Sequence, residues 1–302
     1  MSDPQSSSLL DADAVSRGEA LGLLARTVVE GYRVGEHRSP FKGFAIEFAQ
    51  HREYTTGDDL RHLDWKILGR TDRHYIKQYE QDTNFVAHLL LDGSESMNYG
   101  SGSVSKLQYA KALAACLAHL VLVQRDAVAL NLFDTEVRER LARTDNPGRI
   151  HHIMDRLAAF QATQKTAIAS ALGDLARQLK ARGIVILISD LMAEDDEALA
   201  TGLRQLRFGG SEVIVFHVLD PHEIEFPFTG TVEFEGLEGE PLIETQPASI
   251  RKSYLEAFTT WQRSVRSACD RAGCHYVLAN TSHSLAETLS SYLAFRRKTT
   301  AR

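Results

Sequence analysis

From about residue 85 onward, apolar residues follow two patterns in alternation. Short and nearly unbroken apolar runs are typical of strands buried on both faces of a sheet. They are FVAHLLL (85–91), AVALNLF (127–133), IVILIS (184–189), EVIVFHVL (212–219) and HYVLA (275–279). The longer segments between them carry apolar residues every three or four positions, as helices with one buried face do. These patterns predict helices over 107–121, 149–160, 167–182, 194–208, 253–272 and 285–298.

Strands that alternate with helices predict an α/β fold, with an open, doubly wound and mainly parallel sheet covered on both faces. We assign this sheet domain to residues 85–302, with an inserted β-hairpin at about 223–247. Within that insertion, the run GTVEFEGLEGEPLIET (230–245) alternates and contains glycines suited to a turn. Its glutamates predict a solvated edge that discourages strand pairing.

The first 84 residues do not continue the alternation. Residues 1–15 are polar and predict a disordered lead, and helical spacing follows over about 14–32. From residue 31 to residue 82 the chain is rich in Gly, Arg, Asp and aromatic residues, with short alternating runs. We therefore expect 16–84 to form a helix and an irregular, β-rich module.

The composition restricts the class of protein. The 302 residues are 43% hydrophobic and 25% charged, which is ordinary for a soluble protein, and the net charge of -6 argues against a nucleic-acid partner. Three cysteines without metal-ligand spacing suit a reducing compartment. The start of the chain lacks the pattern of a signal peptide, and the longest apolar run, 112–123, is shorter than the ~20 residues that cross a bilayer. We expect a cytoplasmic protein without direct membrane insertion.

Oxygen-bearing side chains follow two of the predicted strands. Asp92 comes directly after the first run, with Ser94 and Ser96 at alternate positions, and Asp190 follows the third run. Thr166 begins the helix before that third run. Because the carboxyl ends of parallel strands meet at one edge of a sheet, these side chains are expected to form one site.

The ligand types of this site favour a hard divalent cation. Magnesium accepts oxygen ligands and retains waters, whereas zinc and copper prefer nitrogen and sulfur. We therefore expect Mg²⁺, or else Mn²⁺ or Ca²⁺. A P-loop or a nucleophile elbow does not fit, because the glycines that these motifs require are missing around Lys106 and Ser94. Taken singly, each residue could also form a turn or cap a helix, and their joint occurrence is what favours a metal.

The spacing D-x-S-x-S, followed by the later Thr and Asp, resembles the metal-ion-dependent adhesion site of von Willebrand factor A domains. The resemblance covers about residues 85–219. It implies that the serines and the threonine contact the metal, while the aspartates act mostly through water or hydrogen bonds. It also implies a free coordination position that accepts the acidic side chain of a protein partner.

A second resemblance covers most of the chain. The stretch from Arg52 to Glu80, REYTTGDDLRHLDWKILGRTDRHYIKQYE, resembles the signature of domain-of-unknown-function family 58, and HRSPFKGFAIEF (37–48) and VLDPHEIEFP (218–227) fit it too. This resemblance implies a bacterial cytosolic partner of a MoxR-type AAA+ ATPase in a chaperone-like assembly, without catalysis.

These resemblances leave three functions to compare. The first is a metal-dependent protein-interaction module, the second a magnesium-dependent hydrolase or phosphotransferase, and the third a metal-free scaffold. The second lacks a convincing nucleophile, base or phosphate clamp in the sequence. The signature residues either hold the N-terminal module through ion pairs and packing or form a recognition surface for the ATPase. They are Arg52, Asp58, Asp59, Arg61, Asp64 and Trp65.

Overall fold

The centre of the molecule is a sheet of six strands in the order β10-β7-β6-β3-β4-β5. The computed structural model describes residues 46–55, 64, 67, 69, 74–81, 86–163, 168–179, 183–192, 196–208, 210–237, 242–290 and 292. The strands of the sheet are β3 (Val86–Asp92), β4 (Ala127–Phe133), β5 (Val137–Thr144), β6 (Gly183–Ser189), β7 (Glu212–Leu219) and β10 (His275–Asn280). All neighbouring pairs are parallel except β4 and β5.

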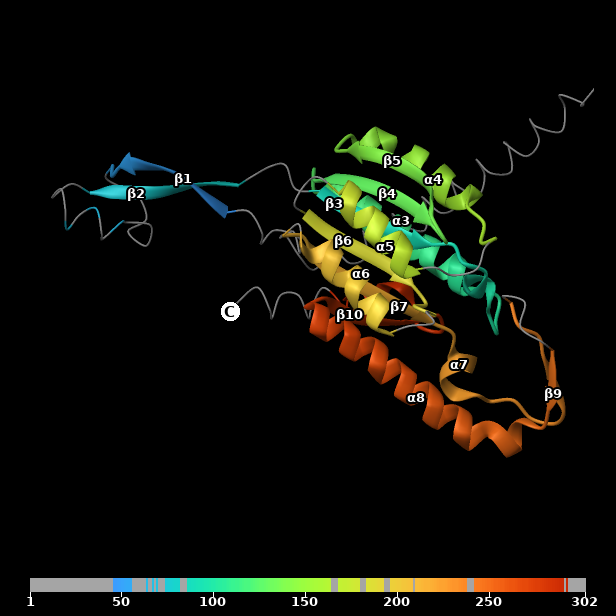
Figure 1. Ribbon diagram of the computed structural model, residues 1–302. Helices are drawn as coiled ribbons and strands as arrows, with labels where there is room; N and C mark the ends of the chain where they lie inside the picture. Colours follow the sequence, from blue (N-terminus) through green and yellow to red (C-terminus); the bar gives the residue numbers. More distant parts are fainter. Residues whose placement is uncertain are drawn as a thin grey trace, which may run out of the picture.

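Helices cover both faces of this sheet (Figure 1). They are α3 (Lys106–Val123), α4 (Ile150–Ala159), α5 (Ile168–Gln178), α6 (Asp196–Phe208) and α8 (Pro247–Ala272), with a short α7 at Pro221–Glu225. Alternate residues of β3 point to opposite faces, so Leu89 and Leu91 join the core with α3 and α4, while Leu90 joins the core with α5, α6 and α8. The predicted fold class is thus confirmed as an open, doubly wound and mainly parallel sheet.

Helix α3 is the most apolar helix of the described part and lies inside the fold. By length and composition alone it could cross a membrane, yet 78% of it is buried within the protein. Helix α3 is therefore a core helix, and its many small alanines allow it to pack closely against the sheet.

The edge strand β5 is not predicted by the sequence pattern. Half of its sequence VRERLART is charged, so it lacks the apolar run of the inner strands. It runs antiparallel to β4 and its side chains alternate between half-buried and exposed. Charged residues on an edge strand hinder pairing with another molecule.

Two hairpins stand outside the six-stranded sheet. Strands β1 (Ile46–Glu53) and β2 (Tyr75–Gln81) form an antiparallel pair, drawn apart from the sheet in Figure 1. Strands β8 (Val232–Phe234) and β9 (Ile243–Thr245) form the hairpin expected within the insertion. The predicted disordered lead and the helix over 14–32 lie outside the described residues.

Candidate metal-binding site

The first member of the site is Asp92, the last residue of β3 and a fully buried carboxylate. Its Oδ1 accepts a hydrogen bond from the backbone N–H of Ser94 at 2.9 Å. Its Oδ2 accepts one from the hydroxyl of Ser189, the last residue of the neighbouring strand β6, at 2.6 Å. These two bonds fix the plane of the carboxylate at the carboxyl edge, where the parallel strands end.

The two serines of the D-x-S-x-S motif lie beside this carboxylate. The Oγ atoms of Ser94 and Ser96 are 3.1 Å apart, so both hydroxyls face the same small volume. Gly93 lets the loop pass close to Phe160, because a Cβ at this position would lie 2.2 Å from the Phe160 Cζ. The structure therefore brings Asp92, Ser94 and Ser96 together as the sequence predicts.

Asp190 enters the site from the neighbouring strand, directly after β6. Its Oδ2 accepts a hydrogen bond from Lys106 Nζ at 2.8 Å, and its Oδ1 accepts one from the backbone N–H of Met192 at 3.2 Å. Burial acts to raise the pKa of Asp190, but the Lys106 charge and hydrogen bonds from Lys106, Ser96 and Met192 hold it below its ordinary value. Asp190 is thus an ionised carboxylate paired with the ammonium of Lys106.

Lys106 is the residue of this site that the sequence pattern does not assign. It is the first residue of α3, is 1% exposed, and also donates to Glu223 Oε1 at 2.7 Å. Burial opposes its charge, yet the two carboxylates raise its pKa above the ordinary value. A cation is disfavoured at a helix N-terminus, so these carboxylates are what stabilise it there. A lysine at the first position of a mainly apolar helix is the sequence signal that could have revealed it.

Glu223 and Asp220 connect the site to α7. Asp220 caps this short helix by accepting from His222 N–H at 2.8 Å, and its own N–H donates to Glu223 Oε2 at 2.8 Å. Asp220 Oδ2 also accepts from the backbone N–H of Ser101 at 2.9 Å, which ties down the loop after β3. The D-x-x-E spacing of a capping box is visible in the sequence, but its link to Lys106 is not.

The charges at the carboxyl edge do not balance. Burial, followed by the nearby charge of Asp190, raises the pKa of Asp92 to about 7, against the hydrogen bonds that favour its ionised form. Of the three carboxylates Asp92, Asp190 and Glu223, only Asp190 and Glu223 contact the ammonium of Lys106. Among the described residues, Asp92 has only hydroxyl and N–H donors around it.

This donor set fits a hard divalent cation. Among the residues that the structure describes, no three His, Cys, Asp or Glu side chains gather as a metal cluster, so a cation here would rest on two carboxylates and on hydroxyls. Carboxylate and hydroxyl oxygens with room for water are ligands that Mg²⁺, Mn²⁺ or Ca²⁺ accepts. Asp92, Ser94, Ser96 and Asp190 are the described residues that would hold it. Thr166, the fifth predicted ligand, lies outside the described residues.

The three cysteines are not part of the candidate metal-binding site. Cys116, Cys269 and Cys274 are buried and free, and burial raises the pKa of each to about 12, so they are poor nucleophiles.

In the N-terminal module, Asp64 is buried and accepts a hydrogen bond from the backbone N–H of Ile67 at 3.3 Å. Arg52 lies on β1 opposite Ile76. The other signature residues, Asp58, Asp59, Arg61 and Trp65, lie outside the described part of the chain.

Several known proteins are similar to this chain in sequence or in structure. The chain is 28% identical to the uncharacterized protein Rv1480 of Mycobacterium tuberculosis over 304 aligned positions, covering 95% of this chain and 92% of the relative. A crystal structure of the conserved hypothetical protein BatB from Bacteroides thetaiotaomicron is 19% identical, with a TM-score of 0.47, over 71% of this chain and 99% of that chain. An aerotolerance-related membrane protein from Bacteroides fragilis is 18% identical, also with a TM-score of 0.47, over 70% of this chain and 99% of that chain.

A family model described as "Protein of unknown function DUF58" matches residues 50–264. The match begins within β1, runs through β2 and all strands of the central sheet except β10, and reaches into α8. Because it covers more than half of the sequence, this chain belongs to the DUF58 family.

Proposed function

We propose that this protein is a non-enzymatic protein-interaction module whose binding depends on a divalent cation at the carboxyl edge. Mg²⁺, Mn²⁺ or Ca²⁺ would be held by Asp92, Ser94, Ser96 and Asp190, together with Thr166. The observation that carries the proposal is the surroundings of Asp92. It is a buried carboxylate beside two hydroxyls and a second carboxylate, and among the described residues no cation pairs with it.

The proposed partner supplies an acidic side chain to the cation. A hard cation held by few protein ligands keeps positions for water, and a carboxylate can replace one of those waters. From the family resemblance we propose a MoxR-type AAA+ ATPase as the partner, within a cytoplasmic, chaperone-like assembly.

The N-terminal signature is given a structural role in this proposal. Asp64 is buried in the module that carries β1 and β2, and its backbone N–H donates to Tyr75 O at 2.8 Å. A residue so enclosed contributes to packing more readily than to a contact surface.

A binding measurement with matched serine variants tests the proposal. Biolayer interferometry would measure the affinity of the purified MoxR-type ATPase from the same genome for wild type and for the double variant Ser94→Ala/Ser96→Ala. This double variant removes two hydroxyl ligands without changing the net charge, and it avoids a chelator, which would also disturb the ATPase. We expect binding to weaken at least about tenfold, corresponding to about 1.4 kcal/mol.

The control is Ser103→Ala, because Ser103 is an exposed serine of the same loop outside the ligand set. It should bind as wild type does. Equal affinity of wild type and the double variant would refute metal-dependent binding of this partner.

A metal-free scaffold is the second candidate, and one observation favours it. Lys106 already neutralises Asp190 and contacts Glu223, so part of the edge is stabilised without any added ion. For a scaffold, millimolar Mg²⁺ or Mn²⁺ would leave the unfolding midpoint unchanged. For the metal-dependent module, the midpoint rises with ion concentration because only the folded state binds the ion.

A further inference from the structure

A cavity of about 620 Å³ opens beside the metal-binding site. Ser96, Lys106 and Glu223 lie at its boundary with the site, so the two spaces are continuous. The rest of the wall is mainly aromatic and comes from α7, the β8–β9 hairpin and α8. The aromatic residues of the wall are Tyr99, Phe226, Phe228, Phe234, Tyr254 and Trp261.

The aromatic wall is held by ring contacts. Phe226 stacks on Tyr254 with ring centroids 4.2 Å apart and meets Phe228 edge to face at 5.1 Å. Phe228 in turn meets Phe234 at 5.2 Å. The Tyr254 hydroxyl donates to the backbone carbonyl of Glu223 at 3.0 Å, which anchors the wall to the helix that carries the site carboxylate. The cavity is therefore preformed.

Large aliphatic side chains form the rim of this cavity and remain exposed. Leu237 is 43% exposed, Ile243 56% and Ile250 37%. An apolar rim around an aromatic cavity marks a binding surface, because exposed apolar groups of this size gain free energy when a partner covers them. The rim residues come from the β8–β9 hairpin and the start of α8.

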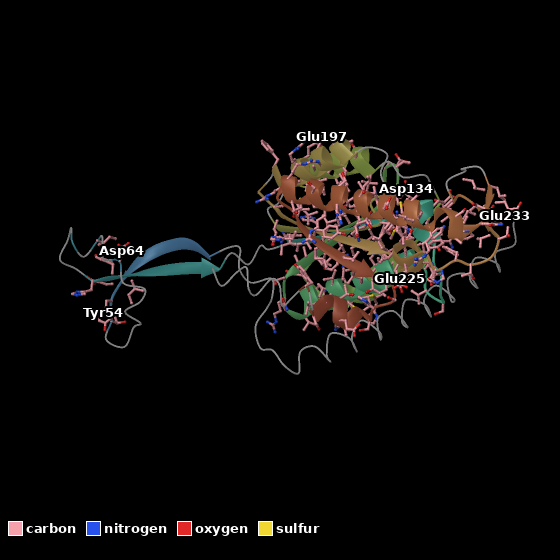
Figure 2. All side chains as sticks on the ribbon, turned by 90° about the horizontal axis from the view of Figure 1, so that it is seen from below. Tyr54, Asp64, Asp134, Glu197, Glu225 and Glu233 are labelled. Carbon is pink, nitrogen blue, oxygen red and sulfur yellow. The ribbon has the colours of Figure 1, made fainter. Side chains whose placement is uncertain are left out.

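Charge on the hairpin restricts the partner. Glu233, Glu235 and Glu244 are exposed there, and Figure 2 shows Glu233 at the outer end of the molecule. These carboxylates disfavour an anionic lipid surface and favour basic residues opposite them. The site beyond the cavity instead requires a carboxylate, if it holds a cation as proposed.

We propose that this cavity binds a large apolar side chain from the same partner segment whose carboxylate reaches the cation. The segment has an acidic residue, an aromatic or large aliphatic residue nearby, and basic residues facing the hairpin. In an extended segment, side chains at alternate positions lie on one face about 7 Å apart, a separation that suits two adjoining sites. The identity of the acidic anchor rests on the proposed function above, whereas the apolar preference rests on the cavity itself.

A panel of synthetic peptides tests the inference. Fluorescein-labelled peptides with one Asp, one Trp and two C-terminal Lys residues, with one to three glycines between Asp and Trp, would be titrated with protein in Mg²⁺. Matched peptides carry Ala in place of Trp. We expect one spacing to bind about tenfold more tightly with Trp than with Ala, as truncation of a central interface residue commonly costs.

Variants of the protein test whether the preference for Trp arises from binding in the cavity. Ile243→Ser changes an exposed rim residue and should leave the fold intact, and Phe228→Ala opens the wall; both should abolish the Trp preference. Phe208→Ser is the control, because Phe208 is 94% exposed on α6 and does not line the cavity.

The outcomes separate this inference from the proposed function. In Ser94→Ala/Ser96→Ala, both peptides should weaken while the Trp preference persists. If the Trp peptide still binds more tightly than the Ala peptide without a divalent cation, the metal-dependent binding of the Asp side chain is refuted. The proposed role of the cavity is then supported. Absence of binding by every peptide, absence of a Trp preference, or a preference that survives in both cavity variants would overturn the inference.

Discussion

Asp92 is the last residue of β3, and Asp134 directly follows the neighbouring parallel strand β4; both are buried, yet their surroundings differ. Asp134 begins the turn from β4 into β5, and its Oδ1 accepts from Thr135 N–H at 2.6 Å and Glu136 N–H at 3.3 Å. Arg138 Nη1 lies 3.4 Å from its Oδ2. Figure 2 shows Asp134 in the sheet domain, between the labelled Glu197 and Glu233. All these contacts of Asp134 come from residues within four positions of it.

Asp92 differs because distant segments surround it. Ser189, on β6, donates a hydrogen bond to Asp92. Asp190 raises the pKa of Asp92 and is itself paired with the ammonium of Lys106 on α3. The comparison indicates that an aspartate at the end of a buried strand stabilises a turn when its hydrogen-bond partners are near it in the sequence. It becomes a candidate ligand when other strands deliver oxygen atoms and charge to it.

The largest effect is expected from removing the ammonium of Lys106, which contacts two carboxylates at the carboxyl edge. Lys106→Met leaves Asp190 and Glu223 buried without their cation, so the free energy of unfolding should fall by about 3–5 kcal/mol. Urea denaturation measures this change. Lys252→Met is the control, because Lys252 is exposed on α8 and its loss should cost little. A loss below about 1 kcal/mol, the scale of a surface ion pair, would contradict the assigned role of Lys106.

His88, on the same strand as Asp92, tests the cost of burial without a partner. Its Nε2 is buried and forms no hydrogen bond within the described part of the chain. Burial, and then the charges of Arg140 and Arg143, lower its pKa to about 4.

The unfolded state therefore binds a proton more readily than the folded state, and stability falls as the pH drops from about 6.5 toward 4. At pH 5 this linkage should cost about 2 kcal/mol relative to pH 7.5, and His88→Val should remove that part of the loss. Urea denaturation at the two pH values measures it, with the exposed His151→Gln as control. An unchanged pH dependence in His88→Val would assign the acid sensitivity to other groups.

The smallest effect is expected at the turn. Asp134→Asn keeps an oxygen that can accept from Thr135 and loses only the charge opposite Arg138, so the free energy of unfolding should fall by about 1 kcal/mol or less. Thermal or urea unfolding measures it. A loss of several kcal/mol would show that Asp134 does more than close the turn, and the contrast with the carboxyl-edge site would weaken.

The sequence predicts those features that depend on local pattern. The apolar runs locate the inner strands, and AVALNLF coincides with β4 (Ala127–Phe133). Because parallel strands end at one edge, the same pattern also predicts that Asp92 and Asp190 approach each other, as they do across β3 and β6.

Features that depend on long-range contacts are not predictable in this way. Lys106 meets its two partners across 84 and 117 positions, and no local pattern encodes such contacts. Likewise β5 carries too few apolar residues to be recognised, because an edge strand has a solvated side. The aromatic cavity forms where the β8–β9 hairpin, α7 and α8 meet. In the sequence its aromatic residues lie in separate segments, and each one resembles an ordinary core residue.

Titration calorimetry with Mn²⁺ tests the central claim most directly, that the Asp92 edge binds a divalent cation. Wild type should show one site, Asp92→Asn should show no binding, and Asp134→Asn should bind as wild type does. Circular dichroism would verify that each variant is folded. No binding of Mn²⁺ or Mg²⁺ by wild type at millimolar concentration, or equal binding by Asp92→Asn, would contradict the account.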